Sequence, residues 1–237
     1  MSPAKLGLLA ALVGVNVAFV LAWMRDARQR AARPRPQLAD VVFGFVTDFL
    51  DALGIGSFAP NTALFKFRGK PADELIPGTL NIGHNAAAFI ETVVFVTSVA
   101  VEPTLLATMV ATAALGAWLG AGVVSRLPRR AIQLFMGAAL LTAAVFFLMS
   151  NLGAFPIGGI AMGLTGWRFG VAVGVNFFLG ALMSIGIGAY APSMVLLALL
   201  GLHPIGAFPI MMATCGIVQP VASLRFFKSG RFSFDSA

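Results

Sequence analysis

Two copies of one short motif hold the residue types that could bind an anion in this chain. The motif reads GIGSFAP from Gly54 to Pro60 and GIGAYAP from Gly186 to Pro192, 132 positions later. Its glycines and proline weaken or break a helix, although each copy lies inside an apolar segment. Where a helix restarts after a break, up to about four backbone N–H groups lack a partner within the helix, and they lie at the positive end of the helix dipole. Each motif therefore predicts a site for an oxyanion that requires no lysine or arginine.

Polar side chains within and beside the motifs can add hydrogen bonds to such an anion. The glycines let it approach the backbone, and His84, in the sequence NIGHN, is a further candidate for binding an anion or moving protons. Two structural alternatives stay open: small residues pack membrane helices closely, and a histidine here can make a plain interhelical hydrogen bond. The candidate substrate-binding residues are Gly54, Gly56, Ser57, Asn61, Thr62, Asn81, His84, Gly186, Gly188, Tyr190 and Ser193.

Asp48 and Asp51 are the candidates for proton coupling. They are three residues apart, so they share the helix face that leads to Gly54. A carboxylate held away from water near an anion site can carry a proton. The alternative is that both face a wet vestibule or cap the ends of neighbouring helices. Glu91 lies in another apolar segment, where we expect it to pair with a polar neighbour.

The same inventory argues against an enzyme. The chain has two histidines and one cysteine, too few for a zinc site, and it has no P-loop motif for a nucleotide. We therefore expect no catalytic residue, no metal and no other cofactor.

The composition is that of a membrane protein. The chain is 59% hydrophobic and 11% charged, against about 25% charged residues in a soluble domain. Its long, continuous apolar runs predict an all-α integral membrane protein. The net charge is +7, but the basic residues form short clusters between apolar runs, as topology signals do. The expected partners are a small anion and the lipid bilayer, with homo-oligomerisation allowed and nucleic acid excluded.

The apolar runs and breakers divide the chain into three regions. Residues 1–37 are expected to hold a span at 6–24 and a basic cytoplasmic linker, with a cleaved signal peptide as the alternative for the span. The first repeat is expected over 38–150, with a broken segment at 38–67 and spans at 75–97, 102–124 and 129–150. The second is expected over 151–237, with a broken segment at 168–200 and a span at 205–224. The second repeat lacks counterparts for two spans of the first, so either the repeat is degenerate or the sequence is truncated at its C-terminus; we favour truncation.

The positive-inside rule predicts that both broken segments are re-entrant. Basic residues flank 38–67 on both sides, so this segment starts and ends in the cytoplasm. Segment 168–200 then starts and ends on the other side, and every lysine and arginine except Lys5 and Arg168 is cytoplasmic. Because an odd number of spans separates the two segments, the prediction is an inverted-repeat bundle whose two re-entrant broken-helix hairpins meet near the midplane.

Several stretches of residues 40–225 resemble the sulfite exporter TauE/SafE family, also called the TSUP permeases. The resemblance implies a multi-span carrier of small anions, typically sulfur oxyanions or organosulfonates, in the bacterial inner membrane. The expected function is therefore a secondary transporter, and a passive anion channel of the same architecture is the alternative. The stretches that carry the resemblance are DFLDALGIGSFAPNTALFKF, IPGTLNIGH, GAWLGAGVVSRLPRR, and GALMSIGIGAYAP with AFPIMMATC.

Overall fold

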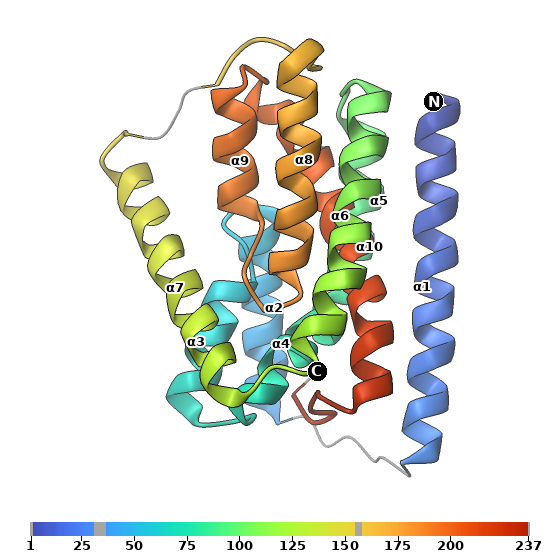
Figure 1. Cartoon of the computed structure of the whole chain (residues 1–237), viewed down its shortest axis with the longest axis vertical. Coiled ribbons are helices and arrows are strands. Elements are labelled where there is room, and N and C mark those ends of the chain that lie inside the picture. Colours follow the sequence, from blue (N-terminus) through green and yellow to red (C-terminus); the bar gives the residue numbers. More distant parts are fainter. Residues whose placement is uncertain (1, 31–36, 155–157, 237) are drawn as a thin grey trace.

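The computed structural model describes residues 2–30, 37–154 and 158–236, and these residues form a bundle of helices (Figure 1). Extended pairing within these ranges is limited to an isolated bridge between Ala161 and Leu202. Residues 31–36, which belong to the predicted basic linker of region 1–37, lie outside the described residues. The helices are α1 (Pro3–Gln29), α2 (Leu38–Ala52), α3 (Phe58–Arg68), the short 3-10 helix η1 (Asp73–Leu75), α4 (Ile76–Gly83), α5 (Asn85–Ser98), α6 (Pro103–Val124), α7 (Arg129–Asn151), α8 (Gly166–Met183), α9 (Tyr190–Leu199) and α10 (Pro204–Ser229).

Five of the described helices are long and apolar enough to cross a bilayer, which confirms an all-α membrane protein. They are α1, α6, α7, α8 and α10. The remaining apolar helices are shorter because the chain breaks at the two motifs and once more at His84.

The break at His84 is a difference from the sequence prediction of one continuous span at 75–97. Helix α4 ends at Gly83 and α5 begins at Asn85. The His84 N–H still donates to the Leu80 carbonyl (3.2 Å), and the Ala88 N–H donates to the His84 carbonyl (3.0 Å), so the chain kinks without separating. Gly83 weakens the helix here, and the His84 ring is held by side chains of α2 and α3, as described below.

Helix α10 is the centre of the bundle. It packs against α1, α4, α5, α6, α8 and α9, and 83% of its apolar 18-residue window is buried. Helices α1 and α7 bury far less and lie on opposite sides of the molecule (Figure 1). Their exposed apolar residues, such as Leu21 and Leu141, suit contact with lipid.

Helices α6 and α8 approach each other closely through glycine. A Cβ on Gly120 of α6 would lie 2.7 Å from the carbonyl oxygen of Ala181 on α8, closer than side-chain carbons come in folded proteins. Small residues are common where membrane helices pack closely, because they allow the two backbones to come into contact.

The two motif segments form two hairpins with the same backbone hydrogen bonds. Helices α2 and α3 form the first hairpin, and α8 and α9 form the second. Three backbone–backbone hydrogen bonds at the first turn have counterparts 132 positions later, so the repeat in the sequence is also a repeat of local structure. The equivalent pairs, with the N–H donor first, are Gly54 to Asp51 (2.7 Å) and Gly186 to Met183 (3.0 Å), Ile55 to Leu50 (3.0 Å) and Ile187 to Leu182 (3.3 Å), and Asn61 to Ser57 (3.1 Å) and Ser193 to Ala189 (2.9 Å).

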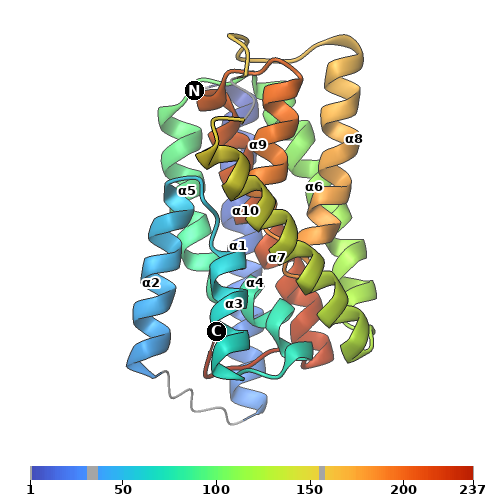
Figure 2. The same ribbon diagram turned by 90° about the vertical axis from the view of Figure 1, so that its left-hand side faces the viewer.

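The hairpins open toward opposite ends of the molecule in Figure 2. Helix α2 begins and α3 ends at the end where α1 finishes, whereas α8 begins and α9 ends at the other end. The two turns therefore lie in the interior of the bundle, between its ends.

A cluster of polar side chains around Asp73 joins the end of the first hairpin to α7. The Asp73 carboxylate accepts hydrogen bonds from Lys66 (2.5 Å), from Arg129 (3.0 and 3.1 Å) and from Gln133 (2.6 Å). Burial alone would raise the pKa of Asp73, but the hydrogen bonds from Lys66, Gln133 and Arg129 outweigh it and lower the pKa from 3.8 to about 2. Because α7 packs chiefly on α3 and η1, this carboxylate fixes the position of a helix that is otherwise mostly exposed.

We expect the Asp73→Asn protein to be less stable than the wild type near neutral pH. The pKa of Asp73 is lower in the folded than in the unfolded protein, so the ionised carboxylate stabilises the fold above about pH 4. For this shift the contribution to the free energy of unfolding is on the order of 2 kcal/mol, and it is lost as the pH falls toward 2. The difference in thermal midpoint between the two proteins in detergent should therefore shrink on acidification. Glu74→Gln is the control, because Glu74 makes only a 3.9 Å ion pair with Arg129. An equal loss in both variants, or a difference that does not depend on pH, would contradict this assignment.

Candidate functional site

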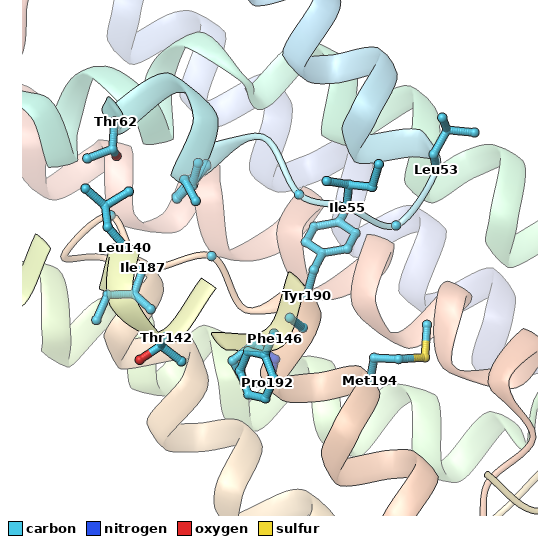
Figure 3. A pocket seen from close by; sticks show the side chains of 17 residues that line it. Leu53, Ile55, Thr62, Leu140, Thr142, Phe146, Ile187, Tyr190, Pro192 and Met194 are labelled. Carbon is cyan, nitrogen blue, oxygen red and sulfur yellow. The ribbon is translucent and has the colours of Figure 1, made fainter. Parts of the chain in front are cut away.

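A cavity of about 270 Å³ lies between the turns of the two hairpins and α7 (Figure 3). Ile55 and Tyr190 border it from the two hairpins, and Thr142 and Phe146 border it from α7. A water molecule in the liquid takes about 30 Å³, so the cavity has room for a small solvated anion. Of the predicted substrate-binding residues, six line it: Gly54, Gly56, Thr62, Gly186, Gly188 and Tyr190.

Both hairpins present the start of a helix at this cavity. Helix α3 begins at Phe58 and α9 begins at Tyr190, and in each helix a proline is the third residue, Pro60 or Pro192. A proline has no N–H, so it fits one of the first helical positions, where an N–H would have no acceptor in the helix. The N–H groups that remain at the two starts are free of intrahelical partners and lie at the positive ends of two helix dipoles.

One buried hydroxyl at the cavity also lacks a partner. Thr62 is 1% exposed, it lines the cavity, and its Oγ1 makes no hydrogen bond with any described residue. A buried polar atom without a partner is costly, and a bound polar ligand would remove that cost.

The turn of each hairpin packs on the first helical residue of the other hairpin. A Cβ placed on Gly56 would lie 3.7 Å from the Cβ of Tyr190, and a Cβ placed on Gly188 would lie 3.8 Å from the Cβ of Phe58. Gly56 and Gly188 occupy equivalent positions, 132 residues apart, and so do Phe58 and Tyr190. The same type of contact therefore occurs twice, once in each direction between the hairpins. The two helix starts are thereby held against each other. The motif thus serves packing, as the structural alternative held, and it also borders the cavity.

Asp51 links the two hairpins beside the contact between their turns. Its side chain is buried, its Oδ1 accepts the Ser57 N–H (2.7 Å), and its Oδ2 accepts the Tyr190 hydroxyl (3.3 Å). The Tyr190 hydroxyl also contacts the Met212 sulfur at 2.7 Å. A small cavity of about 10 Å³ adjoins Asp51, Ser57 and Tyr190. Ser57, a predicted substrate residue, therefore borders this small cavity and has its N–H taken by Asp51.

Asp48, Asn61 and His84 lie in a second, separate cavity of about 240 Å³. His84 Nδ1 pairs with the Asp48 carboxylate, and His84 Nε2 lies 2.7 Å from Asn61 Nδ2. Asn61 also donates to the Thr47 hydroxyl (2.9 Å). The sequence grouped Asn61 and His84 with the motif residues, but the structure places them here, because α3 turns Asn61 and Thr62 toward different cavities.

Asn81 and Ser193 border neither cavity. Asn81 donates to the carbonyl oxygens of Pro77 (2.8 Å) and Met183 (3.3 Å), which joins α4 to the end of α8. Ser193 is buried near the start of α9. Their positions suit packing between helices better than contact with a ligand.

The sequence missed the contribution of α7. Leu140, Thr142 and Phe146 border the cavity between the turns, yet they belong to an apolar span without a motif, so only the tertiary structure reveals them. The expectation that Glu91 pairs with a polar neighbour is wrong for its Oε2, which is buried without a partner among the described residues.

A helical membrane protein with two broken-helix hairpins around a cavity has the architecture of a membrane permease. The family model of the sulfite exporter TauE/SafE matches residues 1–147, more than half of the chain and including the whole first hairpin. The chain belongs to this family of membrane transporters. A search of curated proteins and a search of solved structures each gave no match.

The reciprocal contact of the turns predicts a specific cross-link. In a Cys215→Ala background, Phe58→Cys with Gly188→Cys should form a disulfide, because a Cβ separation of 3.8 Å is near the mean of about 3.8 Å for disulfides. Oxidation of the purified protein followed by peptide mass spectrometry detects the bond. Phe58→Cys with Gly14→Cys is the control, since a Cβ on Gly14 has no neighbour within 4 Å. Equal cross-linking in both pairs, or none in a folded Phe58→Cys, Gly188→Cys protein, would contradict the packing of the turns.

Proposed function

We propose that the cavity between the two turns is the substrate site of a secondary transporter for small anions. The family name suggests sulfite as a substrate. We propose other sulfur oxyanions and organosulfonates as well, and the bacterial inner membrane as the location. The observation that carries the proposal is the pair of helix starts facing one cavity, held together by the reciprocal contacts of Gly56 and Gly188. Backbone N–H groups and the Thr62 hydroxyl would hold the oxyanion.

The kind of lining favours a transported ion over a tightly held one. The described residues that border the cavity include no lysine or arginine, so the anion would be bound by dipoles and hydrogen bonds alone. Binding of this kind is strong enough for selection and weak enough for release. Apolar residues such as Phe146 would keep water from competing for the donors.

The equivalence of the two hairpins suggests how the site could be reached from both sides. We propose that the chain is an inverted repeat, in which the first hairpin opens to the cytoplasm and the second to the other face. The matching hydrogen bonds of the two turns and the opposite directions of the hairpins support this relation. Movement of one hairpin against the other around the shared contact would then expose the site to each face in turn.

Gly188→Leu should abolish anion binding without preventing insertion into the membrane. Gly188 borders the cavity and has no positive φ, so a leucine can take its backbone conformation while its side chain fills the space for the anion. Binding of sulfite, thiosulfate, sulfate, sulfoacetate and taurine to the purified protein would be measured by calorimetry, with an expected loss of tenfold or more for every anion that the wild type binds. Gly56→Leu should have the same effect, with added backbone strain because its φ is +94°.

Gly14→Leu is the matched control, because it adds the same side chain to α1 where nothing lies within 4 Å. Normal anion binding by a folded Gly188→Leu protein would show that the cavity is not the site. Flux of a bound anion into proteoliposomes then separates the two modes: saturable flux at carrier rates supports a transporter, and single-channel current shows a passive channel.

A further inference from the structure

We infer that the Asp51 carboxylate competes with the transported anion for the same hydrogen-bond donors, so that the anion binds when Asp51 is protonated and one proton accompanies each anion. This inference rests on the proposed function of the cavity. It singles out Asp51 from the two candidate carboxylates and gives it the role of an internal anion.

The contacts of Asp51 are those that a bound oxyanion would make. One carboxylate oxygen accepts the N–H of Ser57, the residue that caps the start of α3, and the other accepts the hydroxyl of Tyr190, the first residue of α9. The side chain is 1% exposed. Asp51 therefore bridges the starts of the two helices that border the cavity between the turns. Tyr190 borders both that cavity and the smaller one beside Asp51, whereas Ser57 borders only the smaller one.

A substrate anion and an ionised Asp51 would exclude each other for two reasons. Ser57 N–H and the Tyr190 hydroxyl have one proton each to donate. The Ser57 N–H donates to Asp51, and the Tyr190 hydroxyl lies within hydrogen-bond distance of Asp51 Oδ2 and of the Met212 sulfur. Two negative charges in a site of low dielectric also repel each other strongly. Protonation of Asp51 removes the charge and weakens its hold on both donors, which frees them for the anion.

Titratable groups from several elements surround the Asp51 carboxylate in the described part of the chain. The groups that face it are Asp48 on its own helix, His84 at the junction of α4 and α5, Tyr190 on α9 and Cys215 on α10, and the charge of Glu91 on α5 is also felt at this cluster. No lysine or arginine pairs with Asp51 in the part of the chain that the structure describes. Asp51 thus lies beside a second carboxyl group, that of Asp48, and has no lysine or arginine partner among the described residues.

The small cavity beside Asp51 also provides an acceptor for a proton on the carboxyl group. Gln219 borders this cavity, is 1% exposed, and has an Oε1 without a partner among the described residues. An ionised carboxylate can only accept hydrogen bonds, whereas a protonated one is a donor. At about 10 Å³ the cavity has room for about one water molecule, which could relay that hydrogen bond.

The second hairpin has no such internal anion. Met183 stands at the position equivalent to Asp51, and the residue equivalent to Ser57 is Ala189. The backbone N–H groups at the start of α9 would thus be open to an anion at any pH, whereas the Ser57 N–H and the Tyr190 hydroxyl would depend on a proton. Asp48 differs from Asp51 because it pairs with His84 in the separate cavity and its side chain is 27% exposed.

The test is the pH dependence of anion binding to the full-length purified protein. The probes are thiosulfate and sulfate, which both stay dianions between about pH 5 and 9, so that any pH dependence belongs to the protein. Above the pH at which Asp51 loses its proton, the affinity of the wild-type protein for each anion should fall about tenfold per pH unit. Asp51→Asn, which mimics the protonated side chain, should bind with an affinity that is independent of pH and within about threefold of the wild-type value at low pH.

Asp48→Asn is the matched control and should keep the tenfold slope. Calorimetry of the wild type in buffers of different ionisation enthalpy gives a second measurement that needs no variant, and it should show uptake of one proton per anion at high pH. Anion binding by the wild type with neither a pH slope nor proton uptake would overturn the inference while leaving the proposed function intact, and so would an unchanged slope in Asp51→Asn. Absence of binding by the wild type to every probe at every pH would overturn the proposed function and the inference together.

Discussion

The structure depends on one constraint, which is that a broken helix at membrane depth must have its backbone groups enclosed by protein or by a wet cavity. The chain breaks twice at glycine-rich turns, and each turn is covered by the other. Gly56 lies against Tyr190 and Gly188 lies against Phe58, so the absence of a side chain in one hairpin makes room for the first helical residue of the other. The central, buried helix α10 provides the rest of the enclosure, since Met212 and Cys215 on it pack beside Tyr190 in the same core cluster.

The same constraint explains which parts of the fold can be predicted from the sequence. Glycines and a proline in an apolar run are conspicuous, and their repetition 132 residues later locates both hairpins to within about two residues at the turns. The long spans follow from hydropathy alone. The break at His84 could not be predicted in this way, because Gly83, His84 and Asn85 are individually tolerated in helices. It depends on side chains of α2 and α3, which hold the His84 ring.

The candidate site was predicted only in part, for a related reason. Residues of the two motifs line the cavity, since the turn itself forms its wall. Asn61 and His84 lie elsewhere because position along a helix sets the direction of a side chain, and α3 separates Asn61 from Thr62. The wall supplied by Leu140, Thr142 and Phe146 is set by the packing of α7 on α3 and η1, which no local pattern encodes. The sequence left three interpretations of Asp51 open: a proton carrier, a residue facing a wet vestibule, and a helix cap. The structure shows the cap, because Asp51 Oδ1 accepts the Ser57 N–H.

Capping and proton transfer need not be separate roles for this carboxylate. An aspartate that caps an exposed helix has only a structural role. When that contact opens, water solvates both the carboxylate and the N–H group. Asp51 caps a helix start that borders the cavity proposed for the anion, where an anion could take its place. The contact that completes the first hairpin is thus the contact that a substrate would have to displace. Since Met183 replaces this group in the second hairpin, the two turns share backbone hydrogen bonds but differ in charge. That difference would make the start of α3 responsive to protons, while the backbone N–H groups at the start of α9 would remain a constant site for the anion.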